Sequence, residues 1–306
     1  MNLSQNHRTR GYILGALAAA TYGTNPLFAL PLYDAGMNVD SVLLYRYLIA
    51  AAMMALLMLT RMESLAVTRH QLPALVIAGV LFALSSWLLF ESYNYMDVGI
   101  ASTILFVYPV IVAIIMAVCY HERLNPLTSL SIILALVGIV LLYDGGGEET
   151  VSTYGIILVV LASIAYAVYM VAINKSRLRH MSSMKLTFYS LLFGSSVFIV
   201  RVAFVTDLSP VTTPLSWWCI IAIGIFPTII SLMAMAVAIR DIGSTPTAIL
   251  GALEPVTALI IGVLIFGESL TPRSIFGIFL VLAAVTLLVV ARPLFMAIRQ
   301  LLHLHR

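Results

Sequence analysis

The sequence predicts an all-α membrane protein whose ten transmembrane helices form two inverted five-helix repeats. The prediction rests on the composition, on ten apolar stretches and on an internal repeat. Hydrophobic residues make up 62% of the 306 residues and charged residues only 9%, whereas a soluble domain carries about a quarter charged residues. The lipid bilayer is therefore the expected partner of most of the surface. The net charge is only +3 and no basic run is interleaved with aromatics, so no nucleic-acid partner is expected.

Ten apolar stretches are each close to the roughly 20 residues that a membrane span needs. They are approximately Gly11–Tyr33, Val42–Leu59, Leu72–Tyr93, Val98–Tyr120, Pro126–Tyr143, Tyr154–Asn174, Met184–Val205, Ser216–Ile239, Thr245–Phe266 and Pro272–Ala291. The first stretch begins after a basic segment, as a signal peptide would, but it continues past Pro26 and is long enough to span the membrane. We therefore expect it to be retained.

The charged residues predict the orientation of these spans. With the N-terminus in the cytoplasm, one side receives the cations Arg8, Arg10, Arg61, Arg69, Arg123, Lys175, Arg177, Arg179, Lys185, Arg240, Arg292, Arg299 and Arg306. The other side receives mainly acids, with only Arg201 and Arg273 at its border. Cationic short loops mark the cytoplasmic side. Both termini are thus expected in the cytoplasm, and the membrane is expected to be a bacterial inner membrane.

The second half of the chain repeats features of the first. Asp97-Val98-Gly99 matches Asp241-Ile242-Gly243 at an offset of 144, and Pro109 matches Pro255 at an offset of 146. Because five is odd, a second five-helix copy must insert upside down. Inverted repeats with interrupted helices in corresponding positions are typical of transporters with a binding site near the midplane.

These observations predict four segments. Residues 1–10 are a cytoplasmic tail, 11–150 the first repeat, 151–291 the second repeat and 292–306 a second cytoplasmic tail. The glycine-rich loop Asp144–Thr153 is the expected hinge, and Pro293–Arg306 could form a short amphipathic helix on the inner surface.

Two stretches carry a resemblance to a known family. DIGSTPTAILGALEPVTALIIGVLIFGESLTPRSIFGIFLVLAAV, and its weaker first copy DVGIASTILFVYPVIVAIIMAVCYHERLNPLTSLSIILALVG, resemble the EamA domain of the drug/metabolite transporter superfamily. The resemblance extends from Gly11 to about Val290, and the first copy lacks the usual glycine at Tyr120-His121-Glu122. It implies a ten-helix bundle whose first, third, fourth, sixth, eighth and ninth helices line a central cavity. It also implies transport of small metabolites, often amino acids.

Glu254 is the sharpest candidate for a site residue. A carboxylate in hydrocarbon is costly, so it should face the protein interior or a wet cavity, together with Gly251 on the same helical face. At the offset of 146 its counterpart is Tyr108, which precedes Pro109 as Glu254 precedes Pro255. Glu254 would hold a substrate amine or carry a coupling proton. The alternative is an acid that only ties two helices together.

Other polar and helix-breaking residues complete the expected cavity. Tyr22 and Tyr166 form a second symmetric pair that lines the cavity or packs as satisfied aromatics. Asn25 is expected to be functional because a primary amide in hydrocarbon needs partners. Ser86 and Thr228 either line the cavity or pack helices together. The expected helix breaks are Pro26, Pro109, Pro227 and Pro255.

Arg46 and Glu91 lie at similar depth near the outer ends of their spans. An ion pair between them would relieve two costly charges, so we expect a structural or gating pair there.

The residues argue against other functional classes. All six histidines fall in loops or tails, and neither H-E-x-x-H nor G-x-S-x-G occurs, so an intramembrane enzyme has little chemistry available. We expect no cofactor and no metal. A non-transporting structural or assembly protein stays an alternative. The expected function is secondary transport of a small polar metabolite, with an amino acid or a related compound as the expected substrate, with or without proton coupling. The oligomeric state, monomer included, is left open.

Overall fold

The computed structural model describes residues 2–121, 126–142, 152–242, 247 and 250–287. Helices account for its regular structure, and within these ranges no strand occurs. In the first half they are α1 (Asn2–Tyr22), α2 (Asn25–Asp34), α3 (Val39–Thr60), α4 (Leu72–Ser92), α5 (Val98–Leu105), α6 (Tyr108–Tyr120) and α7 (Pro126–Leu142). In the second half they are α8 (Thr153–Lys175), the short 3-10 helix η1 (Arg177–His180), α9 (Ser183–Phe204), α10 (Pro214–Gly224), the π-helix η2 (Ile225–Ile230), α11 (Ser231–Ile242) and α13 (Leu253–Phe266). A further apolar helix follows at Pro272–Leu287.

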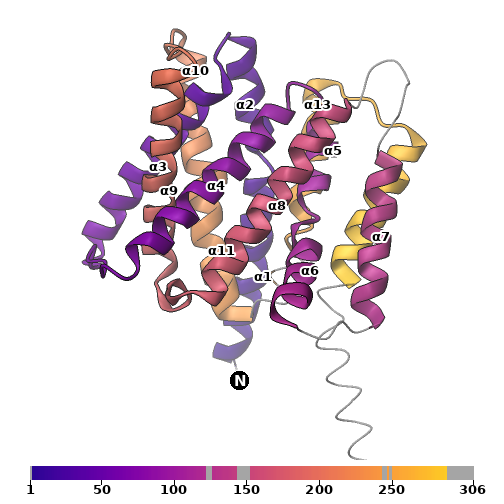
Figure 1. The fold of residues 1–306 in the computed structure, drawn as a ribbon, viewed down its shortest axis with the longest axis horizontal. Helices are drawn as coiled ribbons and strands as arrows, with labels where there is room; N and C mark the ends of the chain where they lie inside the picture. The colour runs from indigo at the N-terminus through magenta and orange to yellow at the C-terminus, as the bar shows by residue number, and fades with distance from the viewer. Residues whose placement is uncertain (1, 122–125, 143–151, 243–246, 248–249, 288–306) are drawn as a thin grey trace, which may run out of the picture.

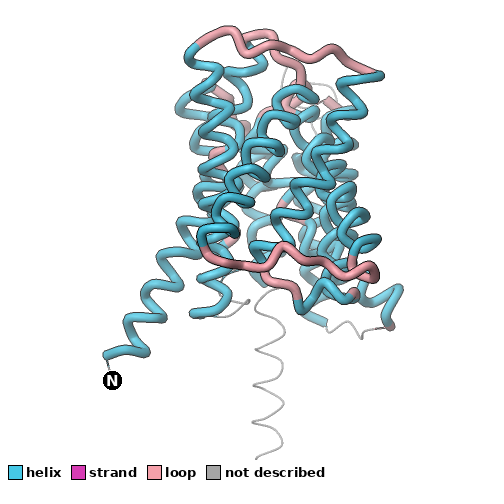
Figure 2. Tube along the Cα trace, turned by 90° about the vertical axis from the view of Figure 1, so that its left-hand side faces the viewer, coloured by secondary structure: helices cyan, strands magenta, loops and turns pink. Residues whose placement is uncertain are grey.

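The helices lie side by side in a bundle, with the connecting loops gathered at its two ends (Figures 1 and 2). Seven helical segments among the described residues are long and apolar enough to cross a membrane. They are His7–Asp34, Val39–Thr60, Leu72–Ser92, Val98–Tyr120, Thr153–Ile173, Ser183–Phe204 and Pro214–Met235. Three shorter apolar helices, Ser129–Leu142, Leu253–Phe266 and Pro272–Leu287, overlap three more of the predicted stretches. A tenfold crossing of the membrane stays a prediction.

The outer surface of the bundle is apolar. Large side chains such as Leu264, Phe279 and Ile133 are exposed, which in water would be an unusually large apolar surface and in lipid is the expected one. The predicted hinge 144–153 and the predicted helix 293–306 lie largely or wholly outside the described residues.

Small residues let helices from the two halves approach closely. A Cβ added to Gly79 on α4 would lie 2.7 Å from the Cβ atom of Phe193 and 3.0 Å from the backbone nitrogen of Gly194, both on α9. Close backbone approach of this kind drives helix association where lipid removes the hydrophobic effect. Next to this crossing Tyr47 packs edge-on against Phe198, with ring centroids 5.0 Å apart.

We define two ends of the bundle from the chain direction. The N-terminal end carries the start of α1, the end of α8 and the start of α9, and Figure 2 shows the N-terminus there. The far end carries the loop between α2 and α3, the end of α4 and the end of α9. The sequence predicts that the N-terminal end faces the cytoplasm.

Candidate functional site

A central cavity of about 400 Å³ lies between helices of both halves of the chain. Six of the predicted site residues line it, namely Tyr22, Ser86, Tyr108, Tyr166, Gly251 and Glu254. Arg46 lines it as well. The lining continues to Ile173 near the end of α8 and to Ser183 at the start of α9. The cavity therefore extends from mid-bundle toward the N-terminal end.

Glu254 sits in the first turn of α13. The helical path is broken just before it, where its backbone N–H donates to the carbonyl of Gly251 at 3.0 Å. The break is tight, because a Cβ added to Gly23 would lie only 2.5 Å from the carbonyl oxygen of Glu254. The loop between α1 and α2 thus holds the start of α13 in place and fixes where the acid enters the cavity.

Aromatic side chains form one wall of the cavity. The ring of Tyr108 meets that of Tyr166 edge-on at 4.7 Å between centroids, and Tyr166 stacks on Tyr169 at 5.7 Å. Phe82 lies 5.4 Å from Tyr169 between ring centroids. Tyr22 lies within electrostatic reach of both Arg46 and Glu254. An apolar wall with a few polar groups is the usual composition of a small-molecule site.

The structure corrects the predicted ion pair between Arg46 and Glu91, because the described residues contain no such pair. Instead, Arg46 donates from Nε to the Oγ1 atom of Thr228 at 3.1 Å, and its guanidinium carbon lies 5.2 Å from the centre of the Phe90 ring. Glu91 accepts a long contact of 3.5 Å from the hydroxyl of Tyr95. Similar depth in the membrane did not bring the two charges together because the Arg46 side chain is directed into the cavity.

Asn25 does not line the cavity, which corrects the prediction that it is a cavity residue. Its side-chain amide donates to the carbonyl of Tyr22 at 2.9 Å, across the break between α1 and α2. The residue is buried, and its Oδ1 atom has no hydrogen-bond partner among the described residues. Asn25 therefore stabilises the break between α1 and α2 through this hydrogen bond. The next residue, Pro26, stands in the first turn of α2.

The other prolines lie at comparable interruptions. Pro109 stands in the first turn of α6, and Pro255 in the first turn of α13, where a missing backbone N–H costs no helical hydrogen bond. Pro227 lies inside the π-helix η2. Thr228, the next residue, does not line the cavity itself but contacts Arg46, which does.

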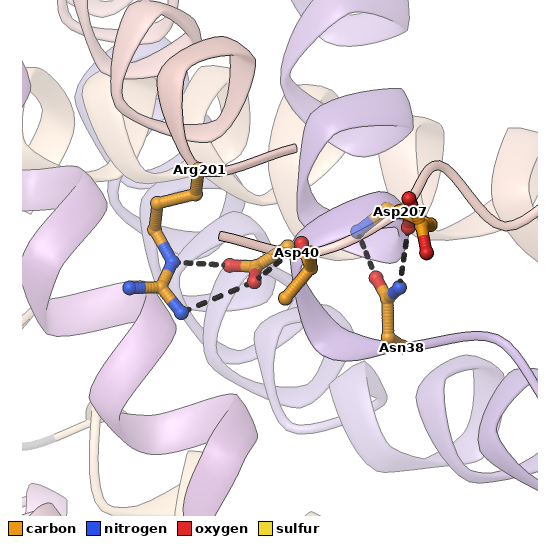
Figure 3. A network of polar contacts seen from close by, with 6 residues as sticks. Asn38, Asp40, Arg201 and Asp207 are labelled. Carbon is orange, nitrogen blue, oxygen red and sulfur yellow. Dashed lines mark hydrogen bonds and ion pairs between the residues drawn. The ribbon is translucent and has the colours of Figure 1, made fainter. Parts of the chain in front are cut away.

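A separate polar network, which we call the far-end network, lies at the far end of the bundle (Figure 3). Arg201 of α9 donates to both carboxylate oxygens of Asp40 on α3, at 2.6 and 3.1 Å. Asn38 caps α3 by accepting from the backbone N–H of Ser41, and its amide donates to the carbonyl of Asp207 at 2.7 Å. The network joins the two halves of the chain beyond the cavity.

Sequence reasoning missed some of these contacts. Arg201 was one of only two cations on the predicted outer side, which is a signal, but its pairing with Asp40 depends on how α9 packs on α3. The guanidinium carbon of Arg201 also lies 4.3 Å from the centre of the Trp87 ring. Phe82 and Met170 line the cavity and carried no signal beyond their apolar character. No group of three or more His, Cys, Asp or Glu side chains that could hold a metal occurs in the part of the chain that the structure describes.

Comparisons with known proteins identify the class. The model of the EamA-like transporter family matches the chain twice, at residues 9–144 and 153–290. The chain therefore belongs to the EamA-like transporter family. Members of this family and the relatives that match the chain are transporters rather than enzymes. The family and the apolar helices make the chain an integral, multi-pass membrane protein.

Relatives and a solved structure agree with this class. An uncharacterized transporter of Archaeoglobus fulgidus is 29% identical over 189 residues, which cover 62% of this chain and 66% of that protein. The transporter sll1319 of Synechocystis, also uncharacterized, is 28% identical over 69% of this chain and 64% of its own length. These two matches thus span slightly less than two thirds of each relative. The uncharacterized transporter YdfC of Bacillus subtilis is 26% identical over 79% of each chain.

A solved crystal structure is similar to 94% of this chain and to 99% of its own, with a TM-score of 0.67 and 19% identity. At this identity the likeness concerns the fold alone.

Proposed function

We propose that this chain is a secondary transporter that moves a small amphipathic metabolite, an amino acid or a related compound, by alternating access. The substrate occupies the central cavity between two inverted repeats. The observation that carries the proposal is Glu254, an acid in a helix break that faces a cavity formed by both halves. An ionisable group at this depth is costly to keep and is a functional candidate for that reason.

Two hydrogen bonds support the inverted relation between the halves. Ser85 on α4 donates to the carbonyl of Ala162 on α8 at 2.9 Å, and Ser231 on α11 donates to the carbonyl of Ala18 on α1 at 2.8 Å. The two serines differ by 146 in sequence and the two alanines by 144, the same offsets as in the sequence repeat. Each half of the chain therefore donates one of these two hydrogen bonds and accepts the other, as a two-fold relation between the halves requires.

The shape of the cavity supports alternating access. It reaches residues at the N-terminal end, including Ser183, whereas the far-end network ties α3 to α9. A substrate site that opens toward one end and is closed at the other is one of the two states that alternating access needs. On the predicted orientation this is the state that faces the cytoplasm.

The lining of the cavity supports an amphipathic substrate. Glu254 offers an anionic partner for an amine, and the aromatic wall of Phe82, Tyr166 and Tyr169 offers an apolar surface. An amino acid combines an amine with a side chain that can contact such a wall. A proton could also reside on Glu254, so the same site is compatible with proton coupling.

Uptake into liposomes tests the proposal. The purified protein is reconstituted and offered a panel of labelled amino acids, nucleobases and inorganic cations, with and without a pH gradient. We expect saturable uptake of at least one amino acid. Glu254→Gln should lower its rate roughly tenfold or more, because a hydrogen bond to a charged group contributes about 1.5–3 kcal/mol. A gradient effect that disappears in the same variant would indicate proton coupling.

Glu91→Gln is the matched control, since it removes an acid that does not line the cavity. It should leave uptake within about twofold of the wild type. Uptake that is indifferent to Glu254→Gln at every pH, or a wild-type protein that transports no member of the panel, would contradict the proposal.

A further inference from the structure

Arg46 is a buried cation whose charge no carboxylate balances in the described structure. The residue is only 2% exposed, and the two hydroxyls beside its guanidinium, those of Thr228 and Tyr22, are neutral. The described ion pairs are those of Arg10 with Asp241 and of Arg201 with Asp40. A buried charge without a counter-charge is costly, so a protein that keeps one has a use for it.

The π-helix η2 determines how Arg46 is held. The hydroxyl of Thr228 donates to the carbonyl of Ile223, five residues earlier, at 3.0 Å. Its one proton is therefore engaged, and its lone pair accepts from Nε of Arg46 at 3.1 Å. The Phe90 ring lies beside the guanidinium. The hydroxyl of Tyr22 also lies within hydrogen-bond reach of the guanidinium. The two terminal nitrogens carry four N–H donors, more than this one hydroxyl can accept, so they can still bind a carboxylate through two parallel hydrogen bonds.

The site crosses the two halves of the chain and has no copy. Arg46 comes from α3 of the first half and Thr228 from the second half. At the repeat offsets of 144 and 146 their counterparts are Ser190 and Phe82, neither of which is charged. The cavity therefore has one cationic side at Arg46 and one acidic side at Glu254. Among the described residues no ion pair joins Arg46 to Glu254, so the charge of each is available to a substrate.

We propose that Arg46, positioned by Thr228 on the π-helix, is a carboxylate-binding subsite of the cavity. The inference rests on the proposed transport function and narrows its substrate class to compounds with a carboxylate at one end and, facing Glu254, an amine at the other. Because Arg46 and Thr228 come from different halves of the chain, a carboxylate bound to Arg46 would influence how the two halves are positioned relative to each other. Thr228 acts through Arg46 and is a positioning residue.

Binding to the purified protein in lipid nanodiscs tests the subsite. The probes are the apolar L-amino acids leucine, methionine and phenylalanine and the amides of the same three compounds, each measured by its effect on the melting temperature and by titration. We expect at least one acid to bind and its amide to bind roughly 10- to 100-fold more weakly, because the amide lacks the charged acceptor. Arg46→Met should remove this preference. Arg46→Lys should weaken it, because an ammonium keeps the charge but lacks the planar pair of donors and the Nε contact.

The positioning role of Thr228 has its own readout. Thr228→Val should reduce the ratio of acid binding to amide binding roughly tenfold, and Thr228→Ser, which keeps the hydroxyl, should restore it. A residue that only stabilised the fold would change the melting temperature and leave the ratio unchanged. Arg201→Lys is the matched control, because that arginine already has a carboxylate partner, and it should keep the wild-type ratio.

The outcomes separate this subsite from the transport proposal. The subsite is overturned if no acid binds, if the amides bind as tightly as the acids, or if Arg46→Met keeps the preference. Uptake of an uncharged or purely cationic compound that depends on Glu254 would overturn the subsite and leave transport standing. A wild-type protein that binds acids with the stated preference but transports none would support the subsite and contradict transport.

Discussion

Arg46 and Arg201 are two arginines of the same bundle with opposite surroundings. The Arg201 side chain keeps 27% of its surface exposed and forms a two-pronged ion pair with Asp40, whose side chain is 4% exposed. Arg46 is almost fully buried and meets a threonine and a phenylalanine ring. A paired charge holds two elements together. An unpaired charge at a cavity wall is available to a ligand, so the presence of a counter-charge distinguishes the two roles.

The largest expected effect comes from breaking the paired arginine. Arg201→Met leaves the carboxylate of Asp40 buried without its partner, which should cost about 3 kcal/mol of stability, at the lower end of the range for buried pairs because Arg201 is partly exposed. The measurement is the thermal denaturation midpoint in detergent. Arg46→Met is the matched comparison and should lower the midpoint far less, since it leaves no charge behind.

The pair can also be removed as a whole. The double variant Asp40→Asn with Arg201→Met should recover part of the stability lost in Arg201→Met, because the stranded charge is gone. Equal losses in Arg201→Met and Arg46→Met would mean that pairing does not distinguish the two arginines.

A second, smaller effect is expected at the helix break that positions Glu254. Gly23→Ala places a methyl group 2.5 Å from the carbonyl oxygen of Glu254 and 2.7 Å from Cβ of Thr257. Backbone cannot move aside as a flexible side chain does, so overpacking should cost about 1–3 kcal/mol and should also lower uptake. Thermal denaturation and liposome uptake measure the two losses.

Gly155→Ala is the matched control for that change. Its new methyl group would lie 3.1 Å from the sulfur of Met96, and a methionine side chain adapts easily. It should lose less stability than Gly23→Ala and keep its uptake. Full uptake by Gly23→Ala would show that the close contact of the α1–α2 loop with α13 does not position the acid.

The contrast between the two arginines also shows how far the sequence predicts this molecule. The apolar runs of the sequence predicted where the long apolar helices lie, because the bilayer imposes a length on a membrane span. The sequence repeat pointed to Tyr108 and Glu254, and both residues line the cavity. The class of protein followed from the same residues that carry the family resemblance.

The contacts that the sequence did not predict depend on the direction in which each side chain points around the axis of its helix. Depth suggested that Arg46 pairs with Glu91, but depth does not say toward which neighbour a side chain points. The pair of Arg201 with Asp40 joins residues 161 positions apart and needs the packing of α9 on α3. Asn25 was expected in the cavity, yet the helix break next to it uses its amide locally.

The smallest expected effect concerns Glu268, a carboxylate whose hydrogen-bond partners are backbone N–H groups. It is an intermediate case between Arg201, which has a charged partner, and Arg46, which has none among the described residues. Glu268, in the loop after α13, accepts from the backbone N–H groups of Val98 at 2.6 Å and Gly99 at 3.4 Å at the start of α5. A helix N-terminus favours an anion. Partial burial works against it more strongly and, together with the neighbouring Asp97, raises the pKa of Glu268 from 4.5 to about 7.

The sign of the pH effect follows from this raised pKa. The folded protein favours the protonated form of Glu268. The contribution of this residue to the free energy of unfolding is therefore complete below pH 4.5 and is lost as the pH rises toward 7. Burial also raises the pKa of Asp97 to about 6, which acts in the same direction. The melting temperature should therefore fall between pH 4.5 and 7.5. Glu268→Gln should flatten this slope and Asp97→Asn should remove part of the remainder, whereas Arg46→Met should keep the wild-type slope. A slope that Glu268→Gln leaves unchanged would show that the backbone N–H groups at α5 offset the burial of this carboxylate.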